Sequence, residues 1–211
     1  GDDSKKKEKT PGLDPLSLLV SYLARIKNIT ASYQNGYVQS FSRKNELPSF
    51  LFQLGAPHSM PDDYLDSTDN DNTFTLSTGI FLGRNLDSTI NFSHTLNRRY
   101  SSASIQDIST TFPDLTLSLM NWEKWLGLSK YISGGRINTG FQYTVRANGD
   151  IDWDKPKQET QTLSLSPLVG FTGNLFNKVT TNLSFSMSQS INTTDMDTYE
   201  TVKTNNSQSL N

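Results

Sequence analysis

The sequence predicts an all-β chain, a segment of an antiparallel transmembrane β-barrel with one short N-terminal helix. First, apolar and uncharged polar residues alternate over stretches longer than a typical strand of a soluble sheet. Second, hydrophobic residues make up only 34% of the 211 residues although aromatic residues reach 10%, which is typical of strands in which every second residue is apolar. Third, long polar connections alternate with shorter ones, as extracellular loops alternate with periplasmic turns in outer-membrane barrels.

The stretch Lys178–Asn192 shows the alternation most clearly. Side chains of one parity are mostly apolar, and those of the other parity, from Thr180 to Asn192, are all Ser, Thr or Asn. Successive side chains of a strand point to opposite faces, so this stretch has one apolar face and one uncharged polar face. A membrane-spanning strand needs about 9–11 residues of this pattern, apolar toward lipid and polar toward the lumen.

Three parts follow one another along the chain. Residues 1–12 are a charged linker, and residues 13–24 form a short helix, because Asp14 and Pro15 supply an N-cap and a first-turn proline. Residues 25–211 form the β-barrel segment, with about eight or nine long antiparallel strands, and we expect this segment to be cut at both ends from a longer chain. The expected strands are Arg25–Gln34, Ser49–Gly55, Thr73–Leu82, Ser88–Arg98, Asp114–Met120, Arg136–Arg146, Thr160–Phe171 and Lys178–Asn192, with a further strand that starts near Tyr199.

The connections between these strands differ in length. Those at one end of the strands are expected to be long and polar, and those at the other end short or of medium length, with 121–135 as the medium one. The long connections are Ala56–Asn72, Arg99–Pro113 and Ala147–Glu159, and the short ones are Gly83–Asp87 and Thr172–Asn177.

Two connections carry further signals. Residues 37–42 either continue the first strand or pair back on it after Asn35-Gly36, a favourable turn dipeptide. The medium connection holds Trp122, Trp125 and Tyr131, whose amphipathic rings suit a membrane–water interface. A tryptophan cluster in the core of a soluble domain is the alternative interpretation of these rings.

Each strand assigns its residues to one of two faces. The uncharged polar parity would form the wall of a hydrated pore, to which arginines add local positive potential, and the apolar parity would contact lipid. The expected lumen-facing residues are Thr75, Ser77, Asn91, Ser93, Thr95, Arg136, Asn138, Gln142, Thr144, Arg146, Ser164, Ser166, Asn182, Ser184, Ser186 and Ser188. The expected lipid-facing residues are Phe74, Leu76, Ile80, Ile90, Phe92, Leu117, Phe141, Tyr143, Leu163, Leu165, Leu183, Phe185 and Met187.

The sequence offers no pattern typical of a metal or catalytic site. His58 and His94 are far apart, and no further ligands follow at a recognisable spacing. The acidic clusters at 66–71 and 150–154 lack the Gly and the later Glu of a calcium loop, which favours solvated loops. With no nucleophile arrangement or phosphate loop either, we expect no enzyme activity, no catalytic residues, no metal and no cofactor. A net charge of −2 gives no indication of a nucleic-acid partner.

Three stretches carry a family resemblance. They are the segment 14–33, with Arg25-Ile-Lys-Asn-Ile-Thr-Ala-Ser-Tyr33 as a strand entry, then Pro48-Ser-Phe-Leu-Phe-Gln-Leu-Gly55, and Phe112-Pro-Asp-Leu-Thr-Leu-Ser118 continuing into Trp122-Glu-Lys124. They resemble the SprA (Sov) family, the outer-membrane translocon of the type IX secretion system, associated with gliding motility and cell-surface proteins. The family usually has Trp where this chain has Leu115.

The resemblance implies a slice of a very large single-chain barrel in the outer membrane of a Gram-negative bacterium. Its polar lumen would form a protein-conducting channel for secreted proteins. The implied partners are outer-membrane lipid, the remainder of its own barrel, secreted cargo proteins, and gating or shuttle proteins of the secretion system. Two alternatives stay open: a porin-like or substrate-specific outer-membrane barrel, and a soluble β-sandwich surface adhesin whose long loops would bind its target.

Overall fold

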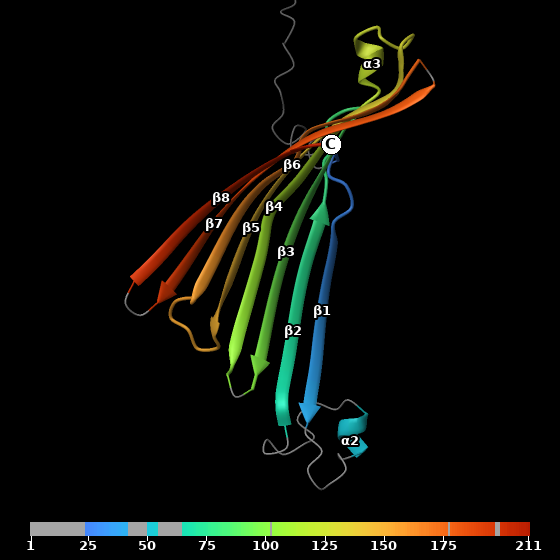
Figure 1. The fold of residues 1–211 in the computed structure, drawn as a ribbon. Coiled ribbons are helices and arrows are strands. Elements are labelled where there is room, and N and C mark those ends of the chain that lie inside the picture. Colours follow the sequence, from blue (N-terminus) through green and yellow to red (C-terminus); the bar gives the residue numbers. More distant parts are fainter. Residues whose placement is uncertain (1–23, 42–49, 55–64, 102, 177, 197–198) are drawn as a thin grey trace, which may run out of the picture.

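The computed structural model describes residues 24–41, 50–54, 65–101, 103–176, 178–196 and 199–211, and within them the chain is all-β, as predicted. One large sheet accounts for nearly all of this part, and the helices are single turns (Figure 1). The elements are β1 (Thr30–Phe41), α2 (Phe50–Gln53), β2 (Leu65–Thr78), β3 (Leu86–Tyr100), β4 (Ile105–Met120), α3 (Trp122–Trp125), β5 (Ile132–Asp150), β6 (Gln158–Leu175), β7 (Val179–Met196) and β8 (Tyr199–Leu210).

The sheet is an antiparallel meander in which each strand pairs with its neighbours in sequence. Eight strands lie in the order β1-β2-β3-β4-β5-β6-β7-β8. The sheet is open, because β1 and β8 form its two edges and are not paired with each other. The antiparallel sheet predicted from the sequence is therefore confirmed, whereas closure into a barrel is not seen within these eight strands.

The strands are longer than predicted, and the predicted alternation of loop lengths is wrong. β2 begins at Leu65 and β4 at Ile105, so residues 65–72 and 105–113, expected to lie in long loops, belong to strands, whereas 151–157 do form a connection between β5 and β6. At the end where β3 meets β4 only residues 101–104 remain as a connection. At this end of the sheet, polar residues extend the pairing of strands beyond the alternating stretches. For example, Asn35 Nδ2 of β1 donates to Asn72 Oδ1 of β2 at 2.7 Å. Alternating hydrophobicity therefore underestimates the length of these strands.

Two local predictions also have a definite outcome. The expected strand over 49–55 is wrong, because Phe50–Gln53 forms the helical turn α2, closed by a hydrogen bond from Leu54 N to Phe50 O at 3.1 Å. A short alternating apolar run does not by itself distinguish strand from helix. Asn35-Gly36 does not form a turn, because both residues lie inside β1 opposite Asn72 and Asp71. The predicted linker 1–12 and helix 13–24 lie outside the described residues, except for Ala24.

Two strand prolines lie at irregularities in the ladder. The pairing of β4 with β3 and with β5 shifts around Pro113, and the pairing of β6 with β7 shifts around Pro167. Proline has no N–H to donate, so within a sheet it is tolerated at an edge or at a bulge. These bulges let the strands keep one polar and one apolar face on both sides of the interruption.

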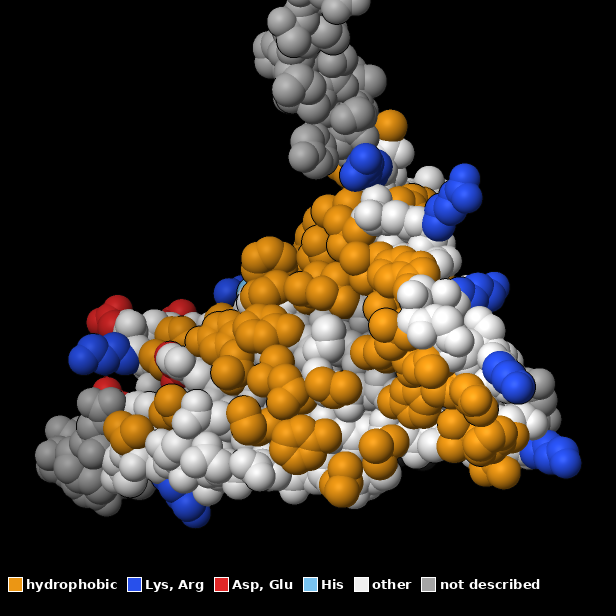
Figure 2. Space-filling view, turned by 90° about the horizontal axis from the view of Figure 1, so that it is seen from above, with side chains coloured by type: hydrophobic (Ala, Val, Ile, Leu, Met, Phe, Trp, Pro, Cys, Tyr) orange, Lys and Arg blue, Asp and Glu red, His pale blue; other side chains and the backbone are white. Residues whose placement is uncertain are grey.

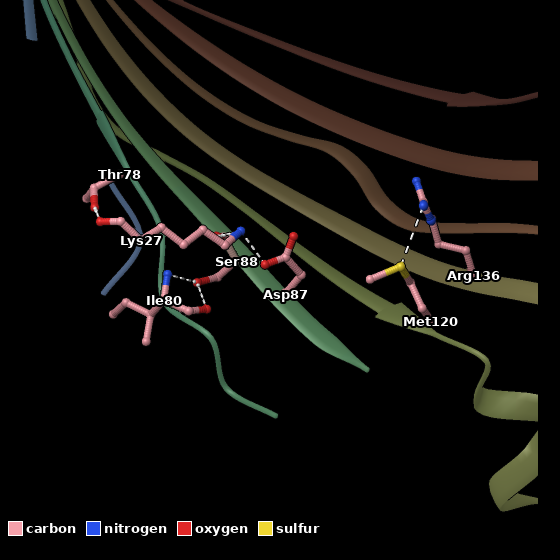
Figure 3. A network of polar contacts seen from close by, with 7 residues as sticks. All are labelled: Lys27, Thr78, Ile80, Asp87, Ser88, Met120 and Arg136. Atoms are coloured by element: carbon pink, nitrogen blue, oxygen red, sulfur yellow. Dashed lines mark hydrogen bonds and ion pairs between the residues drawn. The ribbon is translucent and has the colours of Figure 1, made fainter. Parts of the chain in front are cut away.

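A polar network joins the start of the described chain to the β2–β3 turn (Figure 3). Lys27 Nζ donates to Ser88 O at 3.0 Å and forms an ion pair with Asp87. The Ser88 hydroxyl accepts from Ile80 N at 3.0 Å and donates to Ile80 O at 2.9 Å. Residues 25–27 therefore extend the β1–β2 ladder beyond β1 itself.

The described part has no hydrophobic core. None of its hydrophobic residues is fully buried, and large apolar side chains are exposed on every strand except β5. On one face they contact each other across strands: the rings of Phe74 and Phe92 are 6.0 Å apart, and those of Phe92 and Phe112 are 5.9 Å apart. The described residues supply no second layer to cover this face.

Candidate functional site: the polar face of the sheet

The register of the sheet assembles three adjacent rows of polar residues that cross all eight strands. Residues directly opposite each other in a sheet project from the same face, so each row lies on one face. The first row is Thr30, Ser77, Asn91, Asp114, Gln142, Ser164, Ser188 and Ser207; the second is Ser32, Thr75, Ser93, Thr111, Thr144, Thr162, Ser190 and Asn205; the third is Gln34, Thr73, Thr95, Ser109, Arg146, Thr160, Asn192 and Lys203.

Hydrogen bonds run along these rows from strand to strand. Hydroxyl pairs lie 2.6 Å apart between Ser32 and Thr75 and 3.0 Å apart between Thr111 and Thr144. These contacts use only part of the hydrogen-bonding capacity of each hydroxyl, which has one donor and two acceptor sites. The remaining capacity points away from the sheet, so this face is suited to hold a layer of water.

The side chains of Asn91 and Asp114 continue the hydrogen bonds along the first row. The Ser77 hydroxyl donates to Asn91 Oδ1 at 2.7 Å, and Asn91 Nδ2 donates to Asp114 Oδ2 at 3.2 Å. Asp114, Arg146 and Lys203 are the charged members of the three rows. The central part of this face is therefore overwhelmingly uncharged, which provides hydration without a strong electrostatic site.

Two hollows lie on the polar face. One, of about 450 Å³, is lined by Asn97, Asp107, Arg146 and Asn148 among others, and another, of about 340 Å³, lies over Asn91 and the neighbouring strands. Hydroxyl, amide, carboxylate and guanidinium groups surround them, and no aromatic platform or nucleophile–base pair is present among the residues of the first hollow. This arrangement can bind water and solvated polar groups.

The residues predicted to line a lumen all lie on the polar parity. Most belong to the three rows, and the others form shorter rows, with Arg136 opposite Thr172 and Asn138 opposite Gly170. Ser166 lies where the β6 pairing shifts, and its hydroxyl is 3.4 Å from that of Ser186. The remaining members are Thr75, Ser77, Asn91, Ser93, Thr95, Gln142, Thr144, Arg146, Ser164, Asn182, Ser184 and Ser188.

The residues predicted to contact lipid lie on the opposite parity of the strands, with one outside the strands. Ile80 follows β2 and makes an isolated bridge to Ile26. Hydrophobic side chains cover a broad area of the surface seen in Figure 2. The predicted lipid-facing residues that lie within strands are Phe74, Leu76, Ile90, Phe92, Leu117, Phe141, Tyr143, Leu163, Leu165, Leu183, Phe185 and Met187. Two statements stay predictions: lipid covers this apolar face, and water fills the space in front of the polar face.

Sequence reasoning missed part of the polar face around Pro113. Thr111 and Asp114 both belong to the rows although three positions separate them, because the bulge at Phe112-Pro113 inserts one extra residue. Strict alternation cannot place both residues on one face. A proline inside an alternating stretch is the signal that identifies such a shift.

The candidate metal ligands of the sequence are not brought together. His94 shares a hydrogen bond of 2.9 Å between its Nδ1 and the hydroxyl of Thr110 on the apolar face, and His58 lies outside the described residues. Asp150 forms an ion pair with Lys157 at 2.8 Å. Among the residues that the structure describes, no group of three or more His, Asp or Glu side chains could hold a metal ion.

Comparison with known proteins gives no relative: no protein family, curated protein or solved structure matches this chain. In the described ranges, neither helical turn has the length or the apolar composition to cross a membrane.

Proposed function

We propose that this chain forms part of the wall of an outer-membrane β-barrel that conducts secreted proteins, in the manner of type IX secretion translocons. One observation carries the proposal: three adjacent rows of polar residues cross all eight strands, behind an apolar face that the described residues leave uncovered. A sheet of this kind separates a hydrated space from an apolar one.

The apolar face supports a membrane location. Exposed rings and aliphatic chains such as Phe112 at 53%, Val169 at 55% and Leu183 at 52% would be costly in water at this density. In hydrocarbon the same face needs no cover, and the backbone groups are paired between neighbouring strands as the bilayer demands. The soluble adhesin, by contrast, needs a second sheet packed on this face.

The open edges support a barrel with more strands than these. Eight strands suffice to close the smallest membrane barrels, whose interior is filled by side chains. Here eight strands leave β1 and β8 unpaired with each other. Unpaired strand edges are not tolerated in lipid, so the remainder of the barrel would pair with both edges. A barrel enlarged in this way has room for a water-filled lumen, and the resemblance of residues 14–125 to a protein translocon favours polypeptide cargo.

Cysteine accessibility tests the assignment of the two faces. The chain has no cysteine, so Ser164→Cys and Leu165→Cys each introduce one thiol, at neighbouring positions of similar exposure on opposite faces of β6. In the intact protein assembled in outer membranes, a charged, water-soluble thiol reagent should modify the thiol of Ser164→Cys and leave that of Leu165→Cys unmodified. Equal and rapid modification of both variants would overturn the proposal, because water would then reach both faces.

Cross-linking separates the translocon from a porin-like barrel, which shares the same wall. A photoreactive maleimide attached to the thiol of Ser164→Cys should capture secreted polypeptides in cells that are exporting protein. The matched probe on the Leu165→Cys variant should capture none. Channel conductance without any polypeptide captured at position 164 would favour a porin-like channel.

A further inference from the structure

The two ends of the sheet differ in charge. The turn end consists of the connections 79–85, 121–131 and 176–178, and it carries Arg84, Lys124, Lys130 and Lys178 as exposed cations. In the described part of the chain none of these four takes part in an ion pair.

The acids of the turn end are neutralised or covered. Asp87 is paired with Lys27, as Figure 3 shows, and Glu123 is only 1% exposed beneath the β4–β5 connection. At the opposite end two cations are paired, Arg99 with Asp69 at 2.7 Å and Lys157 with Asp150, whereas the exposed Lys155 is in none of the ion pairs of the described residues.

The opposite end is acidic. Asp107, Asp152, Asp154 and Asp195 are exposed there in addition to those paired carboxylates. In the view of Figure 2, Asp and Glu side chains are visible only at the left, whereas Lys and Arg side chains also follow the right-hand margin. The sheet is therefore polarised along the strand direction, with unpaired positive charge at the turn end.

Exposed apolar and aromatic side chains accompany these cations in each connection. Phe81 is 55% exposed, Trp125 and Leu126 are each 66% exposed, and Phe176 is 65% exposed. The ring of Tyr131 lies edge-on to that of Phe176, with their centroids 6.0 Å apart. Trp and Tyr rings beside cations are the side chains that partition to the boundary between hydrocarbon and lipid headgroups.

We infer that the turn end binds the anionic phosphate headgroups of one membrane leaflet, and thereby orients the wall with its acidic end at the other surface. This inference rests on the proposed function. A lysine or arginine near an anionic lipid surface strengthens binding to that surface. Lipid fits better than an acidic protein because a cation and an exposed ring recur in three separate connections along the edge, and a protein footprint would gather them in one patch.

The test uses fluorescence quenching by lipid in the intact protein, reconstituted into vesicles of phosphatidylcholine that also contain phosphatidylglycerol. Trp122 and Trp125 of α3 report on the turn end, and Trp153→Phe removes the tryptophan of the opposite end. Brominated phosphatidylglycerol should quench the tryptophan fluorescence more strongly than brominated phosphatidylcholine at the same mole fraction of brominated lipid. This preference for phosphatidylglycerol should decline as the salt concentration is raised.

Charge reversal provides the matched comparison. The triple variant Lys124→Glu, Lys130→Glu, Lys178→Glu should lose the phosphatidylglycerol preference by on the order of tenfold or more. The triple Lys→Arg variant and Lys155→Glu, at the acidic end, should keep it.

Three results would overturn the inference. Equal quenching by both lipids in the wild-type protein, at low salt, would refute leaflet binding while leaving the proposed function intact. Equal quenching together with binding of polyglutamate that the triple Glu variant loses would assign the turn end to an acidic protein. Failure to enter bilayers of any composition would refute the membrane location itself.

Discussion

The two faces of the sheet are built on different principles. On the polar face, hydroxyl and amide groups hydrogen-bond from strand to strand, as between Ser188 and Ser207 at 2.9 Å. On the apolar face, side chains such as Phe74, Phe92 and Phe112 contact one another across strands and are not buried. The polar face is complete in contact with water, whereas the apolar face depends on an environment that the described residues do not supply. The stability of this sheet is therefore a property of the chain and its surroundings together.

The apolar face is also uneven across the sheet. Ile90, Leu115 and Phe141 lie side by side across β3, β4 and β5. Near the β8 edge this face also carries amides: Gln189 lies opposite Leu163, and Asn206 lies opposite Gln189. An amide in hydrocarbon without a partner costs a few kcal/mol. The β8 edge is therefore the part of this face that most needs a neighbouring strand or protein beside it.

The largest expected effect comes from placing a charge on each face in turn. Phe185→Asp should block assembly in the membrane, because a carboxylate that faces lipid costs a few kcal/mol. Ser186→Asp, one residue further along β7 on the polar face, should be tolerated. The measurement is the fraction of intact protein that shows heat-modifiable migration and needs detergent for extraction. Equal tolerance at both positions would contradict the assignment of the faces.

The next largest effect is expected where the polar face is closely packed. A Cβ added at Gly140 would stand 2.7 Å from the backbone oxygen of Ser166, which the β6 bulge brings over β5. Gly140→Ala should destabilise the protein by about 1–3 kcal/mol because the bulge must move. Gly83→Ala is the control, since nothing lies within 4 Å of its added Cβ. The free energy of unfolding by denaturant in detergent micelles compares the two variants. A loss at Gly83 as large as that at Gly140 would contradict the close contact with Ser166 as the cause.

Alternation in the sequence predicted the faces well and the boundaries of the strands poorly. Strands β5, β6 and β7 carry long alternating stretches, and their register places the predicted residues on common faces. The polar ends of the strands are invisible to such a pattern: Asn70 lies outside the predicted strand Thr73–Leu82, yet it pairs with Tyr37 of β1 and with Arg98 of β3. The bulge at Pro113 also changes parity within β4, which moves Asp114 onto the polar face.

The cooperation between strands could not be predicted at all from a single sequence. Each hydroxyl is ordinary by itself, and it becomes part of a continuous row only through the register of every strand on both sides. That register depends on the bulge at Pro113 and on hydrogen bonds between residues far apart in sequence. The candidate site is for this reason a property of the assembled sheet, and no motif within one strand identifies it.

A smaller effect is expected from removing one hydroxyl of a row. Thr111→Val deletes the hydrogen bond to Thr144, which joins β4 to β5 at 3.0 Å. If water fills the space in front of this face, a water molecule replaces the lost partner. The loss of unfolding free energy then stays near the lower end of about 0.5–1.5 kcal/mol. Denaturant unfolding in micelles measures it, with Thr110→Val on the apolar face as the comparison. There His94 Nδ1 would lose its partner without water nearby, so a larger cost is expected. A smaller cost at 110 than at 111 would reverse the assignment of wet and dry faces.

The smallest effect is expected from breaking an exposed ion pair at the acidic end of the sheet. Asp69→Asn breaks the ion pair with Arg99, whose side chain is 51% exposed. Exposed pairs of this kind contribute at most about 1 kcal/mol and are screened by salt. The variant should therefore match the wild-type protein in denaturant unfolding at high ionic strength and differ from it slightly at low ionic strength. A large loss that persists in high salt would mean that this end of β2 and β3 is enclosed by other parts of the protein, because only a pair removed from water resists screening in that way.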